Sequence, residues 1–251
     1  MTFHPNIAHT EEYTIATYEI DSSKKATIPA LINLMQETAM QQVLIMKVSV
    51  WDLEKHHISW VLMRLQLKIN KIPQLGDRIK IVTNPSGFEK FFTYRDYRIY
   101  DDKDQLIASA SSTWLMMDTI KRRMTRIPDF ILDYQTPNET HPPLPRPLNK
   151  LNPFEADQFI DKPFQVNWHD LDFNEHLSNV HYIKWMLETM EDEVLKKGQL
   201  QQLDLIYRSE ALWKEELISQ THQIDALNFQ HRLIRKSDQK ELASAQTKWK
   251  I

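Results

Sequence analysis

Apolar and polar residues alternate most regularly between residues 61 and 70 of this chain. Polar residues separate five apolar positions there: Val61, Met63, Leu65, Leu67 and Ile69. This period of two is typical of a strand with one buried face. Similar runs predict strands over residues 12–20, 91–100 and 106–118, and the last two are joined by a polar turn at residues 101–104.

Each half of the chain also contains a run with helical spacing. In the first half, Pro29 stands where a helix can begin, because the first turn does not need its missing N–H. Apolar or small residues follow at near-helical spacing: Leu31, Leu34, Met35, Thr38 and Ile45. In the second half, one helical face carries Val180, Ile183, Leu187 and Met190. We expect this helix to stop at Gly198 in a left-handed cap, after two lysines.

The second half repeats the order of the first. Alternation predicts a strand at Phe164, Val166 and Trp168 before the helix. Strands are predicted after it over residues 203–213, 217–229 and 231–251, the last with a turn near residues 237–238. Residues 106–110 with Trp114 also resemble residues 241–245 with Trp249. These patterns indicate two divergent copies of one unit, in which a curved antiparallel sheet wraps around a long apolar helix.

A proline-rich segment separates the two copies. Six prolines lie within residues 134–153: Pro137, Pro142, Pro143, Pro145, Pro147 and Pro153. Proline fixes φ and removes a backbone donor, so this segment is predicted to be an extended linker. The predicted organisation is an N-terminal domain over residues 1–133, a linker over 134–153 and a C-terminal domain over 154–251.

Composition narrows the chemistry. The 251 residues are 41% hydrophobic and 26% charged, with a formal net charge of −3, 3 glycines and 0 cysteines. The charge gives no electrostatic case for nucleic-acid binding, and the glycines are too few for a phosphate-binding loop. The absence of cysteine excludes disulfides, thiolate nucleophiles and Cys-ligated metals. Without a signal-like N-terminus or a long apolar run, we expect a cytoplasmic protein.

The segment over residues 170–182 carries the strongest candidate site. Asp172, Asn174 and His176 occupy every second position in it. In an extended chain these side chains would point the same way, whereas in a helix Asn174 would face away. Three polar groups directly before a helix therefore predict a site where a strand or loop enters the helix.

Three stretches together resemble the acyl-acyl carrier protein thioesterases of plants and bacteria. The first covers residues 59–65 and 73–77, the second covers 108–118, 121–123 and 127–128, and the third covers 170–188. The chain resembles this family over most of its length. The short Asp-x-Asp-x-Asn-x-His core recurs across related thioesterases, so the combination of all three stretches is the more specific signal.

The resemblance implies an α+β tandem hotdog fold, in which each half is an antiparallel sheet around a central helix. It places the family's catalytic aspartate, asparagine and histidine on Asp172, Asn174 and His176. A Tyr-Arg pair followed by glutamate places the family glutamate on Glu210. Plant members follow that glutamate with a cysteine, but here the residue is Ala211, so a cysteine nucleophile is excluded.

The first copy lacks these residues between its first strand and its helix, where residues 21–27 read Asp-Ser-Ser-Lys-Lys-Ala-Thr. One active site per chain is therefore expected, and the resemblance implies that the N-terminal hotdog binds the acyl chain.

These residue types suit thioester hydrolysis, which needs an activated water and a donor for the developing oxyanion. Glu210 or Asp172 could act as the base, and the sequence leaves this choice open. Asn174 would position water or the carbonyl oxygen, and His176 would orient a carboxylate or assist proton transfer. Backbone N–H groups of residues 176–179 at the helix start would bind the oxyanion.

Structural roles compete with these assignments. Asp172 and Asn174 could be turn or cap residues, and Asp170 could be the acid instead of a support for the turn. Glu210 lies out of phase with the apolar positions around it, so a bulge or a site on the other face is required. Glu188 is expected to be a solvated charge. His56 and His57 are neighbours without a third ligand and do not predict a metal site.

The sequence therefore predicts an enzyme that hydrolyses fatty acyl-acyl carrier protein without a metal or redox cofactor. Its predicted partner is the acyl carrier protein, whose acidic surface or pantetheine phosphate could meet Lys121, Arg122, Arg123 and Arg126. An acyl-CoA thioesterase, a non-catalytic acyl-binding protein and a hotdog hydratase are the alternatives. An oligomer is compatible with the sequence, but two hotdogs in one chain do not require one.

Overall fold

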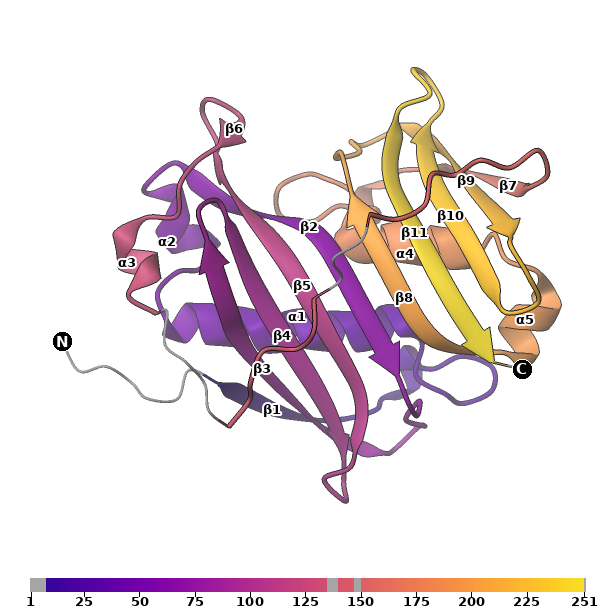
Figure 1. Cartoon of the computed structure of the whole chain (residues 1–251), viewed down its shortest axis with the longest axis horizontal. Coiled ribbons are helices and arrows are strands. Elements are labelled where there is room, and N and C mark those ends of the chain that lie inside the picture. Colours follow the sequence, from indigo (N-terminus) through magenta and orange to yellow (C-terminus); the bar gives the residue numbers. More distant parts are fainter. Residues whose placement is uncertain (1–7, 135–139, 147–149, 251) are drawn as a thin grey trace. The chain divides into compact units, whose positions relative to one another are not determined.

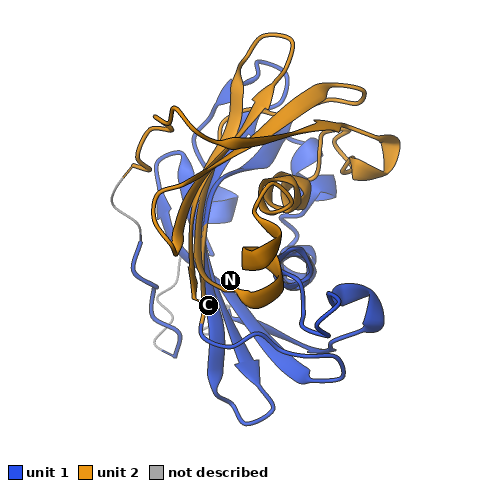
Figure 2. Cartoon of the chain, turned by 90° about the vertical axis from the view of Figure 1, so that its right-hand side faces the viewer, with its two compact units in different colours: residues 1–65, 70–146 blue, residues 66–69, 147–251 orange. Residues whose placement is uncertain are grey.

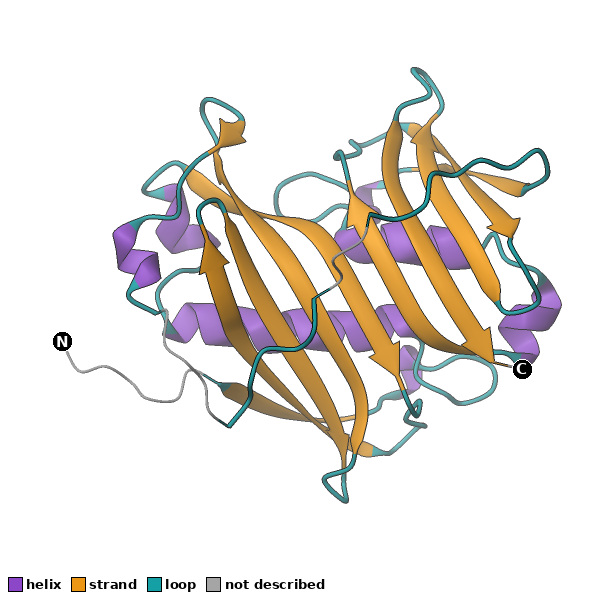
Figure 3. Ribbon diagram, in the orientation of Figure 1, coloured by secondary structure: helices purple, strands orange, loops and turns teal. Residues whose placement is uncertain are grey.

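The computed structural model describes residues 8–134, 140–146 and 150–250. The described residues fall into two compact units (Figure 2). The first unit contains those up to residue 65 together with 70–146, and the second contains residues 66–69 together with those from 150 onward. Each unit is a curved antiparallel sheet with a helix across one face (Figures 1 and 3).

The first unit has the strand order β1-β3-β4-β5-β2, and β6 pairs with β5. Its strands are β1 (His9–Thr14), β2 (Ile58–Ile69), β3 (Arg78–Glu89), β4 (Phe92–Asp101), β5 (Leu106–Asp118) and β6 (Arg123–Met124). Its helices are the 3₁₀ helix Thr17–Glu19, α1 (Ile28–Ile45), α2 (Val50–Glu54) and α3 (Asp129–Leu132). The long helix α1 packs against β1 and β3.

The second unit has the strand order β8-β11-β10-β9-β7, with antiparallel pairing throughout. Its strands are β7 (Ile160–Gln165), β8 (Gln199–Tyr207), β9 (Glu216–Gln223), β10 (Asn228–Arg235) and β11 (Glu241–Lys250). Its helices are the 3₁₀ helix Trp168–Asp170, α4 (Asn179–Leu187) and α5 (Asp192–Lys197). Helix α4 packs against β9 and β10.

Helix α1 begins as the sequence predicts. The Thr27 hydroxyl accepts the Ala30 N–H at 3.2 Å, and Pro29 lies in the first turn. Leu31 and Met35 are buried against the sheet, whereas Ile45 at the end of the helix is exposed. Helix α1 therefore contributes buried side chains to the first unit from Ile28 to Gln42, and its last residues are exposed.

The second helical run is broken in two, which the sequence pattern does not predict. Helix α4 ends at Leu187, and α5 begins only at Asp192. The Thr189 hydroxyl donates to the Trp185 carbonyl at 2.8 Å, a side-chain bond that competes with the helical backbone. Gly198 follows α5 but has φ −77°, so the predicted left-handed cap is wrong. A Cβ there would lie 2.5 Å from the Val194 carbonyl oxygen, and this close approach is what requires glycine.

Four predicted strands differ at their ends. The first is shorter and earlier, because β1 ends at Thr14 and a 3₁₀ helix follows. Trp168 does not extend β7; it lies in a 3₁₀ helix and is exposed. Strand β8 stops at Tyr207, so the rest of the predicted strand over residues 203–213 is a loop. The strand predicted over residues 217–229 ends at Gln223 in β9, and Asn228 already begins β10. Strands β2, β4 and β5 lie close to their predicted bounds. Leu65, Leu67 and Ile69 of β2 are buried as the alternation predicts, but Leu62 is buried between the partly exposed Val61 and Met63, so the alternation fails at the start of the strand.

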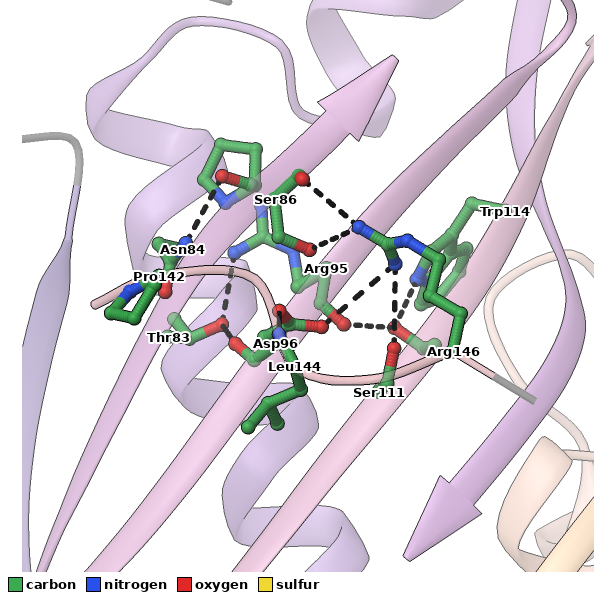
Figure 4. Close-up of polar contacts among 12 residues, drawn as sticks. Thr83, Asn84, Ser86, Arg95, Asp96, Ser111, Trp114, Pro142, Leu144 and Arg146 are labelled. Carbon is green, nitrogen blue, oxygen red and sulfur yellow. Dashed lines mark hydrogen bonds and ion pairs between the residues drawn. The ribbon is translucent and has the colours of Figure 1, made fainter. Parts of the chain in front are cut away.

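Residues 142–146 of the proline-rich segment lie against the outer face of the first sheet, opposite α1 (Figure 4). Asp96 on β4 is fully buried there, and its Oδ2 accepts the Leu144 N–H at 2.7 Å. The Arg98 guanidinium donates to the Pro142 carbonyl. The Arg146 guanidinium stacks on the Tyr94 ring at 3.8 Å. These contacts hold residues 142–146 as a strap across β4.

The strap should depend on Asp96. Replacing Asp96 with Ala leaves the Leu144 N–H without its acceptor, a loss of about 1–3 kcal/mol for a buried hydrogen bond to a charged group. We expect amide exchange at Leu144 to become at least tenfold faster, measured by hydrogen–deuterium exchange. Asp102→Ala, in the exposed turn after β4, is the control. Unchanged protection at Leu144 in Asp96→Ala would contradict this role.

The interior of the second unit contains a buried polar chain. The His231 ring nitrogens lie 2.9 Å from the hydroxyls of Thr221 and Thr247, and the Trp249 indole donates to Thr247 at 3.0 Å. Burial lowers the pKa of His231 to about 3. The imidazole therefore stays neutral in the folded protein across the physiological range.

This histidine should make stability depend on pH. Because the pKa of His231 is lower in the folded than in the unfolded chain, the unfolded chain gains a proton below about pH 6.5 that the folded chain cannot bind. Its contribution to stability should fall by about 2 kcal/mol between pH 8 and pH 5. Urea unfolding of wild type and His231→Gln at several pH values tests this. His231→Gln should show a shallower loss, and His169→Gln, at an exposed position, should match wild type.

Candidate active site

Residues 172–176 form a tight turn, so the predicted extended alternation is wrong. The Asp172 N–H donates to the His176 carbonyl at 2.8 Å, and Glu175 has φ +60°. The Asp172 Oδ1 accepts the N–H groups of Asn174 at 2.8 Å and His176 at 3.2 Å. Aspartate commonly closes such turns, because its carboxylate binds backbone donors a few residues ahead. Asp172 therefore shapes the loop that enters α4.

The turn brings His176 close to Glu210. The His176 Nε2 lies 3.6 Å from Glu210 Oε2, and the two side chains are 32% and 38% exposed. His176 also forms a β-bridge with Leu212, two residues beyond Glu210. Asn174 is exposed on the turn, and its backbone N–H donates to Asp172 Oδ1. Of the four predicted residues, the structure thus pairs His176 with Glu210, while Asp172 supports their loop.

Glu210 reaches this position because it belongs to a loop. Strand β8 has already ended at Tyr207, so strand alternation does not apply to Glu210. The Tyr207 hydroxyl donates to the Asn179 carbonyl at 3.0 Å, and Arg208 Nε donates to Glu241 at 2.7 Å. The Tyr-Arg pair before Glu210 therefore anchors the loop to α4 on one side and to β11 on the other.

Two further side chains fix the same loop, and the sequence pattern predicts neither of them. The Tyr182 hydroxyl on α4 donates to the Ser209 carbonyl at 3.1 Å, and burial raises the pKa of Tyr182 so that it remains a neutral donor. Arg235 at the end of β10 donates to the Glu210 carbonyl at 2.9 Å and pairs with Glu215 at 3.1 Å. Neither residue carried a sequence signal, because Tyr182 lies off the predicted apolar face of its helix and Arg235 ends a strand.

Asp170 has a structural position. Its Oδ2 accepts the Asn167 N–H at 2.8 Å, and its Oδ1 lies 3.3 Å from His181 Nε2. Burial lowers the pKa of His181, and the nearby Asp170 carboxylate opposes this effect. Asp170 therefore closes the 3₁₀ helix and contacts α4, which agrees with the expected support of the turn.

The start of α4 presents backbone donors. The N–H groups of His176, Leu177 and Ser178 are bonded to Asp172 Oδ1, the Ala211 carbonyl and the Asp170 carbonyl. Within the described chain, the N–H groups of Asn179 and Val180 have no acceptor, and Ser178 does not cap them. Among the predicted oxyanion donors of residues 176–179, only the Asn179 N–H is thus available to a ligand. The Val180 N–H, which was not predicted, is also available. Such groups carry the positive end of the helix dipole.

The first unit contains the same turn, closed by Asp21. Asp21 Oδ1 accepts the N–H groups of Ser23 at 2.8 Å and Lys25 at 3.1 Å, and Lys24 has φ +64°. The Lys25–Gln74 bridge corresponds to the bridge between His176 and Leu212. The closing aspartate is therefore common to both copies.

The chemistry of the two copies differs around this common turn. Matching backbone bonds place Lys25 where the second unit has His176, and Ile72 where it has Glu210. The helix start of the first unit offers fewer donors, because Pro29 lacks an N–H and Thr27 caps Ala30, which leaves Ile28 with the one open N–H among the described residues there. An acid–base pair beside open backbone donors is therefore specific to the second unit, within the residues described.

The remaining candidates are explained by local contacts. Glu188 is exposed and lies 3.7 Å from Lys162, as expected for a solvated charge. His56 packs on Phe130 with ring centroids 5.0 Å apart. No group of three or more His, Cys, Asp or Glu side chains in the described ranges could hold a metal ion. None of the helices described is both long and apolar enough to cross a membrane.

Comparison with known proteins agrees with this architecture. Residues 6–134 match the acyl-ACP thioesterase N-terminal domain, and residues 154–251 match the acyl-ACP thioesterase C-terminal domain. The 12:0-ACP thioesterase from Umbellularia californica superimposes with a TM-score of 0.85 at 22% identity, covering 100% of this chain and 99% of that one. An acyl-ACP thioesterase from Bacteroides thetaiotaomicron gives 0.86 at 17% identity, covering 97% and 98%. The predicted tandem hotdog fold is thereby confirmed.

Sequence relatives have the same description. A palmitoyl-acyl carrier protein thioesterase from Cuphea hookeriana is 32% identical over 96% of this chain and 61% of its own length. Oleoyl-acyl carrier protein thioesterase 1 from Arabidopsis thaliana is 29% identical over 81% and 60%. This chain thus spans about three fifths of the length of these curated relatives. The fold and site define a tandem hotdog protein, and the chain belongs to the acyl-ACP thioesterase family.

The two turns offer a matched test. Asp172→Ala and Asp21→Ala each remove a carboxylate that binds two backbone N–H groups, and each should destabilise its own unit by about 1–3 kcal/mol. Thermal unfolding and amide exchange at residues 174, 176, 23 and 25 measure this. If Asp172→Ala has the same stability as wild type and the same amide exchange at the turn, Asp172 does not close the turn.

Proposed function

We propose that this chain hydrolyses fatty acyl-acyl carrier protein and releases the free fatty acid, as a step of fatty acid biosynthesis. The observation that carries the proposal is the pairing of His176 and Glu210 at 3.6 Å, beside the open start of α4, in only one of the two described copies. The names of the sequence relatives, which are acyl-ACP thioesterases and hydrolases, support the same reaction.

In the proposed reaction, Glu210 is the base. Its carboxylate takes a proton from a water molecule while the water oxygen bonds to the thioester carbonyl carbon. His176 holds the Glu210 carboxylate in place through its ring nitrogen. Asp172 is less suited to the role of base, because its Oδ1 already accepts two backbone N–H groups. The sequence left open whether Glu210 or Asp172 is the base, and we propose Glu210.

The oxyanion formed on the carbonyl would be stabilised by the N–H groups of Asn179 and Val180 and by the exposed Asn174 amide. The carbon–sulfur bond then breaks, the electron pair goes to sulfur, and the proton held by Glu210 can pass to the leaving thiolate. The products are a fatty acid and the carrier thiol. A thiolate leaves more readily than an amine, so no strong acid is needed.

The carrier is proposed from charge. Lys121, Arg122, Arg123 and Arg126 are exposed around the β5–β6 turn of the first unit, and they form a cationic surface suited to an acidic protein partner. We also propose that the N-terminal hotdog binds the acyl chain, since it has the hotdog interior without the acid–base pair. The cytoplasmic location expected from the sequence stays a prediction; the plant relatives are described as chloroplastic.

The reaction can be tested by measuring free-thiol release from acyl-ACP and from the matching acyl-CoA. Glu210→Gln and His176→Ala should lower kcat by at least about a hundredfold, as expected for loss of acid–base catalysis. Asp172→Ala should lower activity by disordering the turn, whereas Asp21→Ala in the first unit should retain it.

Each outcome of that assay has a meaning. Faster turnover of acyl-CoA than of acyl-ACP would favour the acyl-CoA thioesterase alternative. No thiol release from either substrate by folded wild type would overturn the enzyme assignment and favour an acyl-binding protein. Full activity in Glu210→Gln would remove Glu210 from the role of base.

A further inference from the structure

Large apolar side chains are exposed on the loops that carry the proposed site. They are Trp168, Phe173, Leu212 and Trp213, each between 46% and 66% exposed. Phe173 lies in the turn closed by Asp172, and Leu212 is the bridge partner of His176. Exposed apolar clusters of this kind commonly mark binding surfaces.

Trp168, Trp213 and Lys214 form the ordered part of this cluster. The two indole rings meet edge to face, with centroids 5.2 Å apart at 72°. The Lys214 ammonium lies 4.2 Å from the Trp213 ring centroid. The Lys214 N–H donates to the Val166 carbonyl at 2.9 Å, which fixes the loop against the end of β7. The result is an aromatic surface with a cation at its edge.

The fold does not require these side chains. In the matching loop of the first unit, the Gly76 N–H donates to the Ile15 carbonyl at 3.0 Å. This bond matches the one from Lys214 to Val166, so Gly76 corresponds to Lys214. Leu75 precedes it where the second unit has Trp213, and Thr17 stands where the second unit has Trp168. The same loop therefore forms without the tryptophans or the lysine.

The backbone at Lys214 strengthens this point. Lys214 has φ +67° and Gly76 has φ +84°, both in the left-handed region. Glycine adopts this region without penalty, whereas a residue with a Cβ pays about 1 kcal/mol or more there. Lys24, Lys47 and Lys90 also have positive φ, so the backbone shows only that this loop accepts glycine as well as lysine.

The ligand follows from the proposed function, on which this inference rests. If the thioester carbonyl lies between Glu210 and the start of α4, the leaving side of the substrate must pass the neighbouring loop residues. That leaving side is a phosphopantetheine arm, which has methyl and methylene groups, two amides and a terminal phosphate. Indole rings suit the apolar groups and amides, and a lysine suits the phosphate.

We propose that Trp168, Trp213 and Lys214 bind the phosphopantetheine arm of the acyl carrier protein. Within the described chain the indole N–H groups of Trp168 and Trp213 have no acceptor, so both can donate to the arm's amide carbonyls. Lys214 contacts the phosphate at the far end. These three residues thus set the affinity for the carrier side of the substrate and leave the acid–base step to His176 and Glu210.

The test uses one acyl chain on four leaving groups: acyl carrier protein, phosphopantetheine, pantetheine and N-acetylcysteamine. Lys214→Gly introduces the residue of the first unit and relieves the positive φ, so the loop should still fold. It should raise KM about tenfold for the two phosphate-bearing substrates, with a much smaller change for acyl-pantetheine.

Trp213→Ala and Trp168→Ala should raise KM for all three pantetheine substrates more than for the N-acetylcysteamine thioester. Leu75→Ala in the first unit is the matched control and should behave as wild type.

A second readout does not depend on turnover. Titration of phosphopantetheine should quench tryptophan fluorescence in wild type, with a Kd that rises about tenfold in Lys214→Gly and a quench that falls in Trp213→Ala. An equal KM ratio between acyl-phosphopantetheine and acyl-pantetheine in wild type and Lys214→Gly would overturn the phosphate contact. Trp variants that raise KM equally for the N-acetylcysteamine substrate would overturn the arm-binding role. Binding without hydrolysis by wild type would refute the proposed reaction while supporting this surface.

Discussion

The turn closed by the Asp172 carboxylate determines the arrangement around the proposed site. Two backbone N–H groups bind one carboxylate oxygen, so the chain reverses within five residues and delivers His176 next to the loop after β8. That loop is in turn held by tyrosine hydroxyls, by Arg208 and by Arg235. The proposed catalytic side chains are therefore partly exposed, while the groups that place them are buried or paired. Such support is what keeps reacting groups within productive distance.

The duplicated fold provides an internal comparison. Asp21 closes an equivalent turn before α1. Its carboxylate accepts backbone N–H groups at the two equivalent positions, and the residue at the equivalent left-handed position is Lys24. Closing the turn is therefore a property of the fold, and an aspartate in this motif is not by itself a sign of catalysis. What differs in the second unit is the residues that this framework carries: an imidazole, a carboxylate and, at Val180, one more open N–H group at the helix start.

The sequence predicted β2, β4 and β5 close to their observed bounds and both helix starts. It did not predict β3, because Thr83 and Asn84 are buried polar residues and Asp96 on the neighbouring β4 receives the strap. A sheet face covered by a polar strap does not show the apolar alternation of an ordinary core strand. The break after α4 was missed because its cause, the Thr189 hydroxyl bonding a carbonyl, leaves the apolar periodicity unchanged.

For the proposed site, the sequence offered four residues through resemblance, and their roles stay a prediction, but their expected geometry differs from the structure. It treated residues 172–176 as extended and Glu210 as part of a strand, since alternation says nothing about a side chain that bonds its own backbone. Tyr182 and Arg235 were missed because their partners are backbone carbonyls distant in sequence. No spacing rule relates a residue on α4 or at the end of β10 to the carbonyls of Ser209 and Glu210.

Covalent linkage of the two hotdogs has an evolutionary consequence. In an assembly of two identical chains, each substitution is introduced into both copies at once, so a residue that improves one copy must be tolerated by the other. Here the codons for Lys25 and His176, or for Gly76 and Lys214, can change independently. One copy can carry Lys214 and exposed tryptophans while the other keeps the glycine loop, so two halves of one chain can diverge under separate selection.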